Sequence, residues 1–221
     1  KLVLRGSLDG KPCPESKPQF AEIPGSGRVQ TISVKTSCEL DCVDFVRAKL
    51  EKGKVGASDV VCLEEANPRK RDFLTSKLLL AHVHVTNGKY KDAERVLTEV
   101  TTTRVGRTDP EVRARLAEIL GRRKKLDDAS EEAEKAWRYR MKFRGGKTQR
   151  ERWILTVLKL RGGFYEQLFY DRGDRTYFDR AIQMYDQLEK SAGKARNSRL
   201  ANDARIAKTR LSQQERQFLG E

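Results

Sequence analysis

The stretch from Leu78 to Val100 constrains the fold more than any other part of this chain. Its letters, LLLAHVHVTNGKYKDAERVLTEV, predict two amphipathic helices that are joined by a tight break at Asn87-Gly88. Ala81 and Ala93 stand where these two helices must approach each other closely. A single helix pair cannot bury its apolar face alone, so the sequence predicts further helices stacked on it.

The spacing of apolar residues in the second of these helices recurs twice downstream. Intervals of three, four and three residues separate Tyr90, Ala93, Leu97 and Val100, then Leu126, Ala129, Ala133 and Ala136, and then Phe178, Ala181, Tyr185 and Leu188. Twelve residues before the second member of each set stand Ala81, Ala117 and Phe169. The pattern resembles the tetratricopeptide repeat (TPR) family, most clearly over residues 74–100 and in degenerate form over 110–191.

The resemblance implies a mostly α fold, a right-handed stack of antiparallel helix pairs (a TPR-like α-solenoid), with a small N-terminal β or irregular segment. We expect a cysteine-containing N-terminal segment at 1–62, a helical repeat domain at 63–221 and a C-terminal capping helix at 198–218. Ala93 and Ala129 are 36 residues apart, but Ala129 and Ala181 are 52 apart, which predicts a lengthened third pair or a different crossing. An unrelated α-helical bundle is the alternative.

Glycines, prolines and capping residues predict where the elements begin and end. Residues 1–5 and 29–36 are β-rich and predict a small two-stranded element. Thr148 with Glu151, and Thr176 with Asp179, are expected to cap helices. The predicted helices cover about 37–53, 58–66, 67–86, 89–102, 109–121, 127–143, 148–168, 176–191 and 198–218.

In TPR-like domains the first helix of each pair lines a concave groove that holds an extended or helical segment of a partner. The resemblance therefore implies a non-enzymatic protein–protein interaction scaffold. By helical phase, the groove residues would be Leu78, His82 and Val85 in the first pair, Glu118 and Arg122 in the second, and Glu166 and Tyr170 in the third. Taken singly, these residues are equally consistent with ordinary half-buried or solvated helix positions.

Positive charge concentrates on the helical part of the chain. The formal net charge is +14, and residues 63–221 supply +12 of it through 36 basic and 24 acidic side chains. Such a balance favours an acidic partner: a protein face, nucleic acid or anionic lipid. The run 137–153 holds seven basic residues and one acidic residue, interleaved with aromatic side chains. The candidate basic surface is Arg138, Arg140, Lys142, Arg144, Arg150 and Arg152.

Three interpretations of this basic surface stay open. It could bind nucleic acid through phosphate contacts and base stacking, face an acidic protein partner, or be a solvated helix face. Helical phase spreads the charges around the helix and leaves the aromatic side chains to the core, which favours the solvated face. A nucleic-acid-binding helical protein is thus the alternative function.

All four cysteines, Cys13, Cys38, Cys42 and Cys62, lie in the first 62 residues. An even number in one loop-rich segment favours two disulfides, with free thiols or a zinc site as alternatives. We therefore expect an extracytoplasmic protein, periplasmic or secreted, in an envelope-associated assembly; the cytoplasm is the alternative. The chain begins at Lys1 without a signal peptide or an apolar run near the ~20 residues of a membrane span, which suits a mature form after cleavage or a trimmed chain.

No motif in the chain supports catalysis or cofactor binding. Residues 146–148 resemble the end of a phosphate-binding loop, but Met141 stands where that motif needs glycine, and a helix precedes it. His82 and His84 would diverge by about 200° on a helix and cannot share a metal ion. Because the chain has no other histidine, a Ser-His-Asp arrangement would have to use one of these two, and nothing near them supports it. With disulfides favoured over zinc at the cysteines, the sequence predicts a non-enzymatic protein without a cofactor or a metal site.

Overall fold

The computed structural model describes residues 2–4, 7–8, 11–12, 19–21, 63–64 and 73–219. The chain divides into two compact units, Lys1–Asn67 and Pro68–Glu221. The predicted strand at 29–36, the predicted helix at 37–53 and all four cysteines lie outside the described residues.

In the described part of the first unit, short strands form two antiparallel pairs. β1 (Leu2–Leu4) pairs with β4 (Gln19–Ala21), and β2 (Ser7–Leu8) pairs with β3 (Lys11–Pro12). In the sequence, Asp9 and Gly10 separate β2 from β3, and Asp-Gly is a favoured pair for a two-residue hairpin connection.

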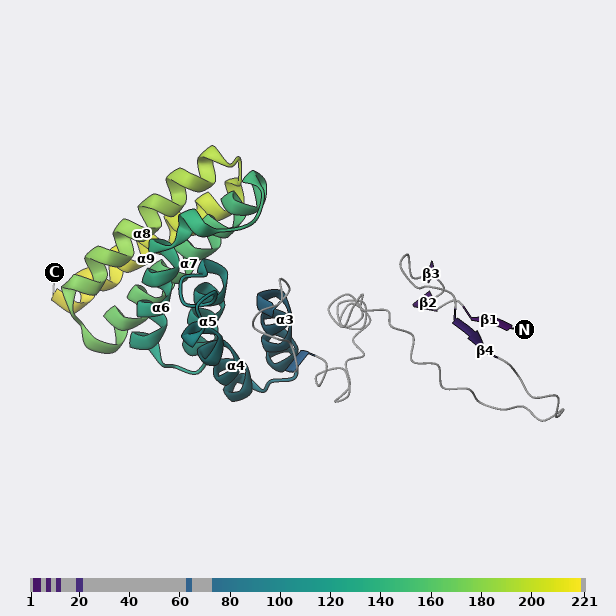
Figure 1. Ribbon diagram of the computed structural model, residues 1–221. Coiled ribbons are helices and arrows are strands. Elements are labelled where there is room, and N and C mark those ends of the chain that lie inside the picture. The colour runs from purple at the N-terminus through teal and green to yellow at the C-terminus, as the bar shows by residue number, and fades with distance from the viewer. Residues whose placement is uncertain are drawn as a thin grey trace. The chain divides into compact units, whose positions relative to one another are not determined.

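The second unit is a succession of helices (Figure 1). They are α3 (Phe73–Thr86), α4 (Tyr90–Thr102), α5 (Pro110–Arg122), α6 (Leu126–Arg138), the 3-10 turn η1 (Arg140–Lys142), α7 (Lys147–Arg172), α8 (Arg175–Lys194) and α9 (Ser198–Leu219). Each helix packs on the next one along the chain, so α3/α4, α5/α6 and α7/α8 form pairs and α9 packs on α8. The predicted mostly α stack of helix pairs is confirmed.

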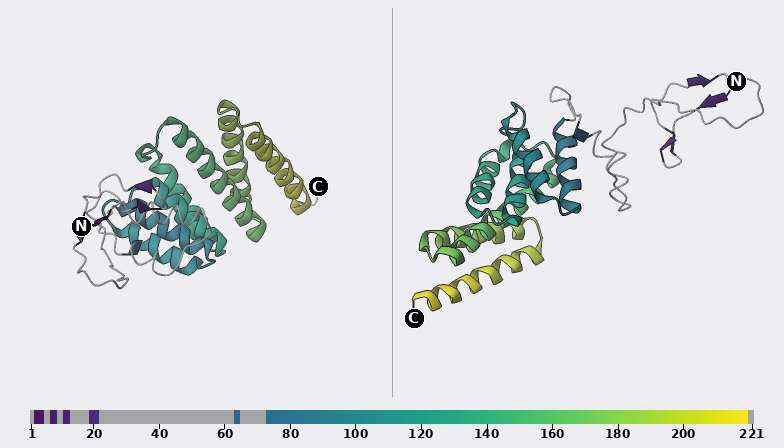
Figure 2. Two further views of the ribbon diagram at one scale, coloured as in Figure 1. Left: turned by 90° about the vertical axis from the view of Figure 1, so that its right-hand side faces the viewer. Right: turned by 90° about the horizontal axis from the view of Figure 1, so that it is seen from below.

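The first helices of the pairs also contact one another. α3 packs on α5 and α5 packs on α7, whereas the second helices α4, α6 and α8 touch one another sparsely or not at all. Figure 2 shows the helices following one another through the stack in two further directions. We call α3, α5 and α7 together the first-helix layer.

The turns inside the first two pairs have the same geometry. Gly88 between α3 and α4 has a φ of 71°, and Lys124 between α5 and α6 has a φ of 61°. In both turns the amide of the next residue donates to a carbonyl five residues back, at 2.8 Å and 3.0 Å respectively. Left-handed residues with such hydrogen bonds are the usual way to end a helix. Since Gly88 and Lys124 are 36 residues apart, the repeat period is visible in the backbone itself.

The third pair absorbs the 52-residue interval by lengthening its helices. α7 has 26 residues and α8 has 20, against 13 each for α5 and α6. α7 passes without interruption through Gly162 and Gly163. Phe169 takes the place that alanine has in the other pairs, and it is buried with its ring centroid 5.5 Å from that of Phe178.

The residues predicted to cap or start a helix are correct for α5 and wrong for α7 and α8. Asp109 caps α5, because its Oδ1 accepts hydrogen bonds from the amides of Glu111 and Val112, both at 3.0 Å. The predicted cap pair of Thr148 with Glu151 is wrong, since α7 begins one residue earlier, at Lys147. The side chain of Gln149 there accepts from the Gly146 amide at 3.0 Å.

The predicted cap of α8 by Thr176 with Asp179 is also wrong. Asp174 caps this helix, and its Oδ1 accepts from the Thr176 amide at 2.8 Å. The helix predicted to reach Phe143 ends at Arg138 instead and is followed by η1. Several capping-competent side chains stand close together at each of these ends, and spacing alone does not rank them.

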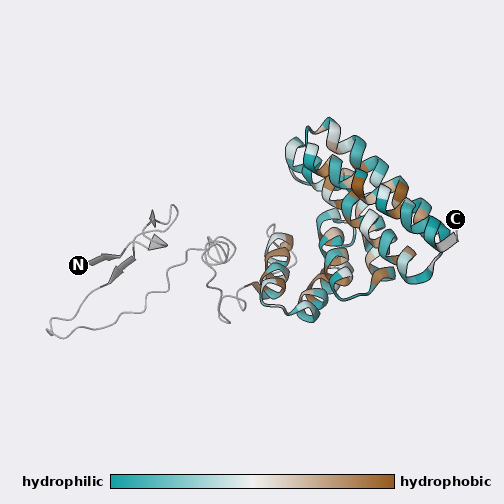
Figure 3. Ribbon diagram, turned by 180° about the vertical axis from the view of Figure 1, so that it is seen from behind, coloured by the Kyte–Doolittle hydropathy of each residue, from teal (hydrophilic) through white to brown (hydrophobic). Residues whose placement is uncertain are grey.

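Buried apolar residues occur on every helix from α3 to α9. Figure 3 shows hydrophobic and hydrophilic residues interspersed along each of these ribbons. The repeat alanines Ala93, Ala129 and Ala181 are each 0% exposed. Small side chains at these positions let the two helices of a pair approach closely. Within the described residues, none of the helices is long and apolar enough to cross a membrane.

Candidate partner-binding groove

The first-helix layer presents one equivalent position three times. His82 on α3, Glu118 on α5 and Tyr170 on α7 are separated by 36 and 52 residues, the same intervals that separate the repeat alanines. His82 is exposed, and Glu118 and Tyr170 are half-buried. Because α3 packs on α5 and α5 on α7, these three side chains belong to one layer of helices.

On α3 the predicted groove residues form a largely apolar stripe. Leu78 and Val85 are half-buried and flank the exposed His82 at intervals of four and three residues. Those intervals keep the three side chains on one face of the helix. This face offers apolar contact together with one imidazole.

On α5 the predicted groove residues are charged and paired with each other. Glu118 accepts from Arg122 Nη2 at 3.2 Å and from Arg115 Nη1 at 3.0 Å. Arg122 also lies over the ring of Tyr90, with its guanidinium carbon 5.9 Å from the ring centroid. Exposed pairs of this kind contribute little to stability, so they remain available for exchange with a partner.

On α7 the predicted groove residue Glu166 lies inside the protein. It is 5% exposed and occupies the position that buried Ala114 has on α5. Its carboxylate accepts hydrogen bonds from Tyr185 at 2.6 Å, from Tyr170 at 2.9 Å and from Arg210. Burial and the neighbouring Glu166 carboxylate raise the pKa of both tyrosines. Glu166 therefore joins α7 to α8 and α9 rather than standing free on the layer.

An open hollow adjoins Tyr170 between α7 and α9. It measures about 640 Å³ and is lined by Gly163, Glu166, Gln167, Tyr170, Arg210 and Gln214. Tyr170 and Arg210 are partly or fully exposed here, whereas the Glu166 carboxylate is covered. The hollow presents hydrogen-bonding groups to an approaching chain.

Three residues of the predicted basic surface are held by neighbours. Arg140 packs on the ring of Trp137, with its guanidinium carbon 4.7 Å from the ring centroid. Lys142 Nζ donates to the Thr108 hydroxyl at 3.0 Å. The Arg144 Nη2 atom lies 3.7 Å from a carboxylate oxygen of Asp109. The last two contacts place Lys142 and Arg144 beside the start of α5, whereas Arg140 packs against α6.

The other three basic residues differ in their surroundings. Arg150 Nη2 donates to the carbonyl of Met141 at 2.9 Å and so ties the start of α7 to η1. Arg138 and Arg152 are exposed, and neither forms an ion pair with any residue that the structure describes. The six cations thus surround one junction, between α6, η1 and α7.

Three of the four aromatic side chains in residues 137–153 pack on the core, as the helical phase predicted. Trp153 is buried with Ala114, Ala136 and Val157, and the Phe143 ring stacks on it at a centroid distance of 5.1 Å. Trp137 packs at the edge of the same cluster. These rings are committed to the core, and base stacking would require exposed ones.

A partly buried ionic network between α6 and α7 had no sequence signal. Arg161 on α7 binds both carboxylate oxygens of Glu134 on α6, at 2.8 Å and 2.9 Å. Tyr165 donates to the same carboxylate at 2.8 Å, and the Arg161 guanidinium carbon lies 5.0 Å from the Trp137 ring centroid. Arg161 and Glu134 are 27 residues apart, so helical spacing gives no indication of the pair. Among the described residues, no cluster of three or more His, Cys, Asp or Glu could hold a metal ion.

A solved structure has a similar arrangement of helices. It holds the nearly identical TPR-like repeats of a chain named as a kinesin light chain of Podosopora anserina, with a TM-score of 0.52. The match covers 80% of this chain and 93% of that chain, at 15% sequence identity. The fold is TPR-like.

A substituted form of that kinesin light chain matches with a TM-score of 0.41, at 15% identity over 80% of this chain and 92% of that chain. No protein family and no curated protein matches the sequence. At this low identity the likeness establishes the TPR-like fold alone. In this chain the TPR-like fold consists of the stacked helix pairs, whose first helices form the first-helix layer, and of the terminal helix α9.

Proposed function

We propose that this protein is a non-enzymatic scaffold that binds a segment of a partner protein along the first-helix layer of its TPR-like fold. A TPR-like repeat fold supports protein–protein interaction in general. The observation that carries the more specific proposal is the recurrence of one outward position, His82, Glu118 and Tyr170, on three helices that pack in sequence.

Each helix of the first-helix layer contributes a different kind of contact to the partner. The apolar stripe around His82 on α3 supplies anchoring contact, since half-buried Leu78 and Val85 lose further water when a partner covers them. The paired charges of Glu118 and Arg122 on α5 select for a complementary pattern and set the orientation of the bound segment. Tyr170 adds an aromatic ring with a hydroxyl at the α7 end.

A photo-crosslinking experiment tests this proposal. A photoreactive amino acid is placed at position 82 on α3 or position 122 on α5, and in a matched control at the exposed Asp128 on α6. The proposal predicts that positions 82 and 122 capture the same protein from a source extract, while position 128 captures none of it. Capture from position 128 alone would place the partner on the second helices and contradict the proposal.

We further propose that the protein acts outside the cytoplasm, in an envelope-associated assembly. This rests on the four cysteines of the first 62 residues, which lie outside the described part of the chain. Intact mass after alkylation under native and reducing conditions tests it. Two disulfides predict four alkyl groups added only after reduction; four groups added to the native, unreduced protein would contradict the proposal.

A further inference from the structure

Positive charge that the sequence divides between two segments meets at one end of the third helix pair. Residues 138–152 and 190–199 together carry eleven Lys or Arg against a single acidic residue, Glu151. We call these two segments the basic end. The second segment, with Lys190, Lys194, Arg196 and Arg199, formed no part of the sequence-based basic surface.

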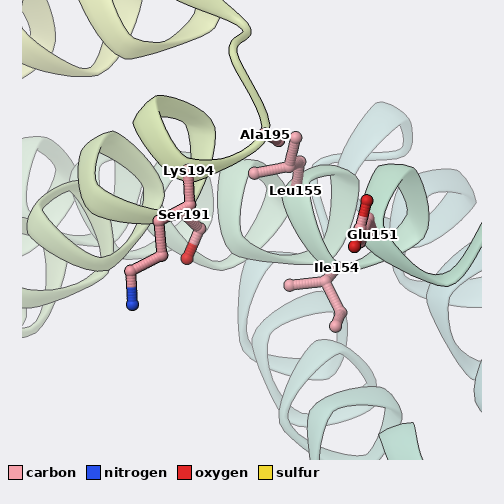
Figure 4. A pocket seen from close by; sticks show the side chains of 6 residues that line it. All are labelled: Glu151, Ile154, Leu155, Ser191, Lys194 and Ala195. Carbon is pink, nitrogen blue, oxygen red and sulfur yellow. The ribbon is translucent and has the colours of Figure 1, made fainter. Parts of the chain in front are cut away.

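The fold brings the two segments side by side. The start of α7 and the end of α8 enclose a hollow of about 240 Å³, lined by Glu151, Ile154, Leu155, Ser191, Lys194 and Ala195 (Figure 4). Arg150 bonds to the Met141 carbonyl, and Phe143 stacks on Trp153, so η1 lies against the same start of α7. Segments that are 38 or more positions apart in the sequence thus lie side by side.

The cations of the basic end have few acidic partners within the protein. Among the residues that the structure describes, Arg144 forms an ion pair with Asp109, and the other ten form none. On the adjacent α9, by contrast, Arg205 and Lys208 both bind Glu189, at 3.1 Å and 2.7 Å. A surface with unneutralised like charges attracts an anionic partner and favours its approach.

The basic end also offers apolar contact at its centre. Ile154, Leu155 and Ala195 line the hollow together with the cation Lys194. Met141, in η1, is 71% exposed. A hollow of this size suits a single apolar side chain better than a cofactor, since ligand pockets run from about 300 Å³ upward. The nearby rings of Trp153 and Phe143 are stacked on each other, which leaves them unsuited to stacking with bases.

We propose that the basic end is a second interaction surface, which binds an acidic protein segment that carries an apolar side chain. The acidic residues meet the unpaired cations, and the apolar side chain enters the hollow between α7 and α8. The basic end is separate from the proposed partner-binding residues on α3 and α5. Binding at the basic end does not depend on partner binding there.

The test uses fluorescent peptides and the full chain. One nine-residue peptide is glutamate throughout except for a central leucine, its partner peptide has a central glycine, and a single-stranded oligonucleotide of equal charge is the third probe. The leucine peptide should bind more tightly than the other two at low salt. The double variant Lys194→Glu, Arg196→Glu should bind the leucine peptide more weakly by roughly tenfold or more, because attraction between opposite charges becomes repulsion.

Two controls separate the surface from general charge. Lys91→Glu on α4 makes half of this charge change at an exposed position far along the chain and should leave binding close to the unsubstituted level. Ile154→Asn, which removes the apolar side chain without adding charge, should weaken binding of the leucine peptide but leave binding of the glycine peptide unchanged. Equal binding of both peptides, stronger binding of the oligonucleotide, or no peptide binding at low salt would each overturn the proposal. Circular dichroism confirms that every variant keeps its helices.

Discussion

Glu166 on α7 accepts hydrogen bonds from Tyr185 on α8, from Tyr170 on its own helix and from Arg210 on α9. A buried carboxylate is costly unless hydrogen bonds and opposite charge replace its water. Here three donors from three helices do so. At the scale of single residues, this carboxylate holds the C-terminal helices in register.

Replacing Tyr185 by phenylalanine should therefore destabilise the protein. The variant leaves one oxygen of the buried Glu166 without its donor, and hydrogen bonds to charged groups contribute about 1.5–3 kcal/mol. Urea unfolding at neutral pH measures the loss. Tyr170→Phe is the matched control and should lose less, because its half-buried position lets water replace the hydroxyl. Equal stability of Tyr185→Phe and the unsubstituted protein would contradict the assigned role.

Tyr165 gives the protein a specific alkaline pH dependence. Burial and the Glu134 carboxylate raise the pKa of Tyr165 to about 12, from an ordinary value of 10.0. Below pH 10 the phenol is protonated whether the chain is folded or unfolded, so its contribution to stability is complete. Between pH 10 and about 12 the unfolded chain loses this proton first, and that contribution falls.

A phenylalanine at position 165 removes this titration. Tyr165→Phe should lose stability less steeply than the unsubstituted protein over pH 10 to 12, although it is less stable at neutral pH. Urea midpoints measured at intervals across this range give the two profiles. Parallel stability profiles for the two proteins would contradict a raised pKa of Tyr165 in the folded protein.

At the scale of helices, contact between first helices depends on a missing side chain. A Cβ atom at Gly121 on α5 would clash with the ring of Phe164 on α7, whereas one at Gly163 on α7 would meet nothing within 4 Å. Gly121→Ala should therefore destabilise by about 1–3 kcal/mol through overpacking. Gly163→Ala should stabilise by up to about 1 kcal/mol through helix propensity. Thermal unfolding of the two variants decides, and a stabilising Gly121→Ala would refute the close contact.

The sequence was informative about helices because glycine, proline and apolar spacing act locally. The break at Gly88 and the start at Asp109 follow from the conformations and hydrogen bonds of neighbouring residues. The sequence was misleading about the starts of α7 and α8, because adjacent polar side chains compete to accept hydrogen bonds from the first amides of each helix. Asp174 prevailed over Thr176 at a spacing of two residues.

The candidate site was predictable in part for the same reason. Helical phase placed His82 and Glu118 on outward positions of α3 and α5, where no later helix covers them. It failed to indicate the burial of Glu166, because that depends on how α8 packs on α7 and on Arg210 reaching this carboxylate from α9. The pair of Arg161 with Glu134 depends in the same way on how α7 crosses α6.

At the scale of the whole molecule, repetition of one helix pair accounts for most of the helical unit. Two pairs follow each other at 36 residues, and the third keeps their packing while α7 doubles in length. Because α7 and α8 pack antiparallel, the start of α7 lies at the end of α8, where the basic end forms. Repetition was visible in the sequence, but the convergence of residues 138–152 and 190–199 required the antiparallel crossing of two long helices.

Hydrogen–deuterium exchange of the chain with and without its crosslinked partner tests the central claim most directly. Binding along the first-helix layer predicts slower exchange in α3, α5 and the C-terminal half of α7, because a bound segment excludes water and suppresses local opening. The second helices α4 and α6 should exchange at unchanged rates. Protection confined to α4 and α6, with none on α3 or α5, would contradict the proposed scaffold function.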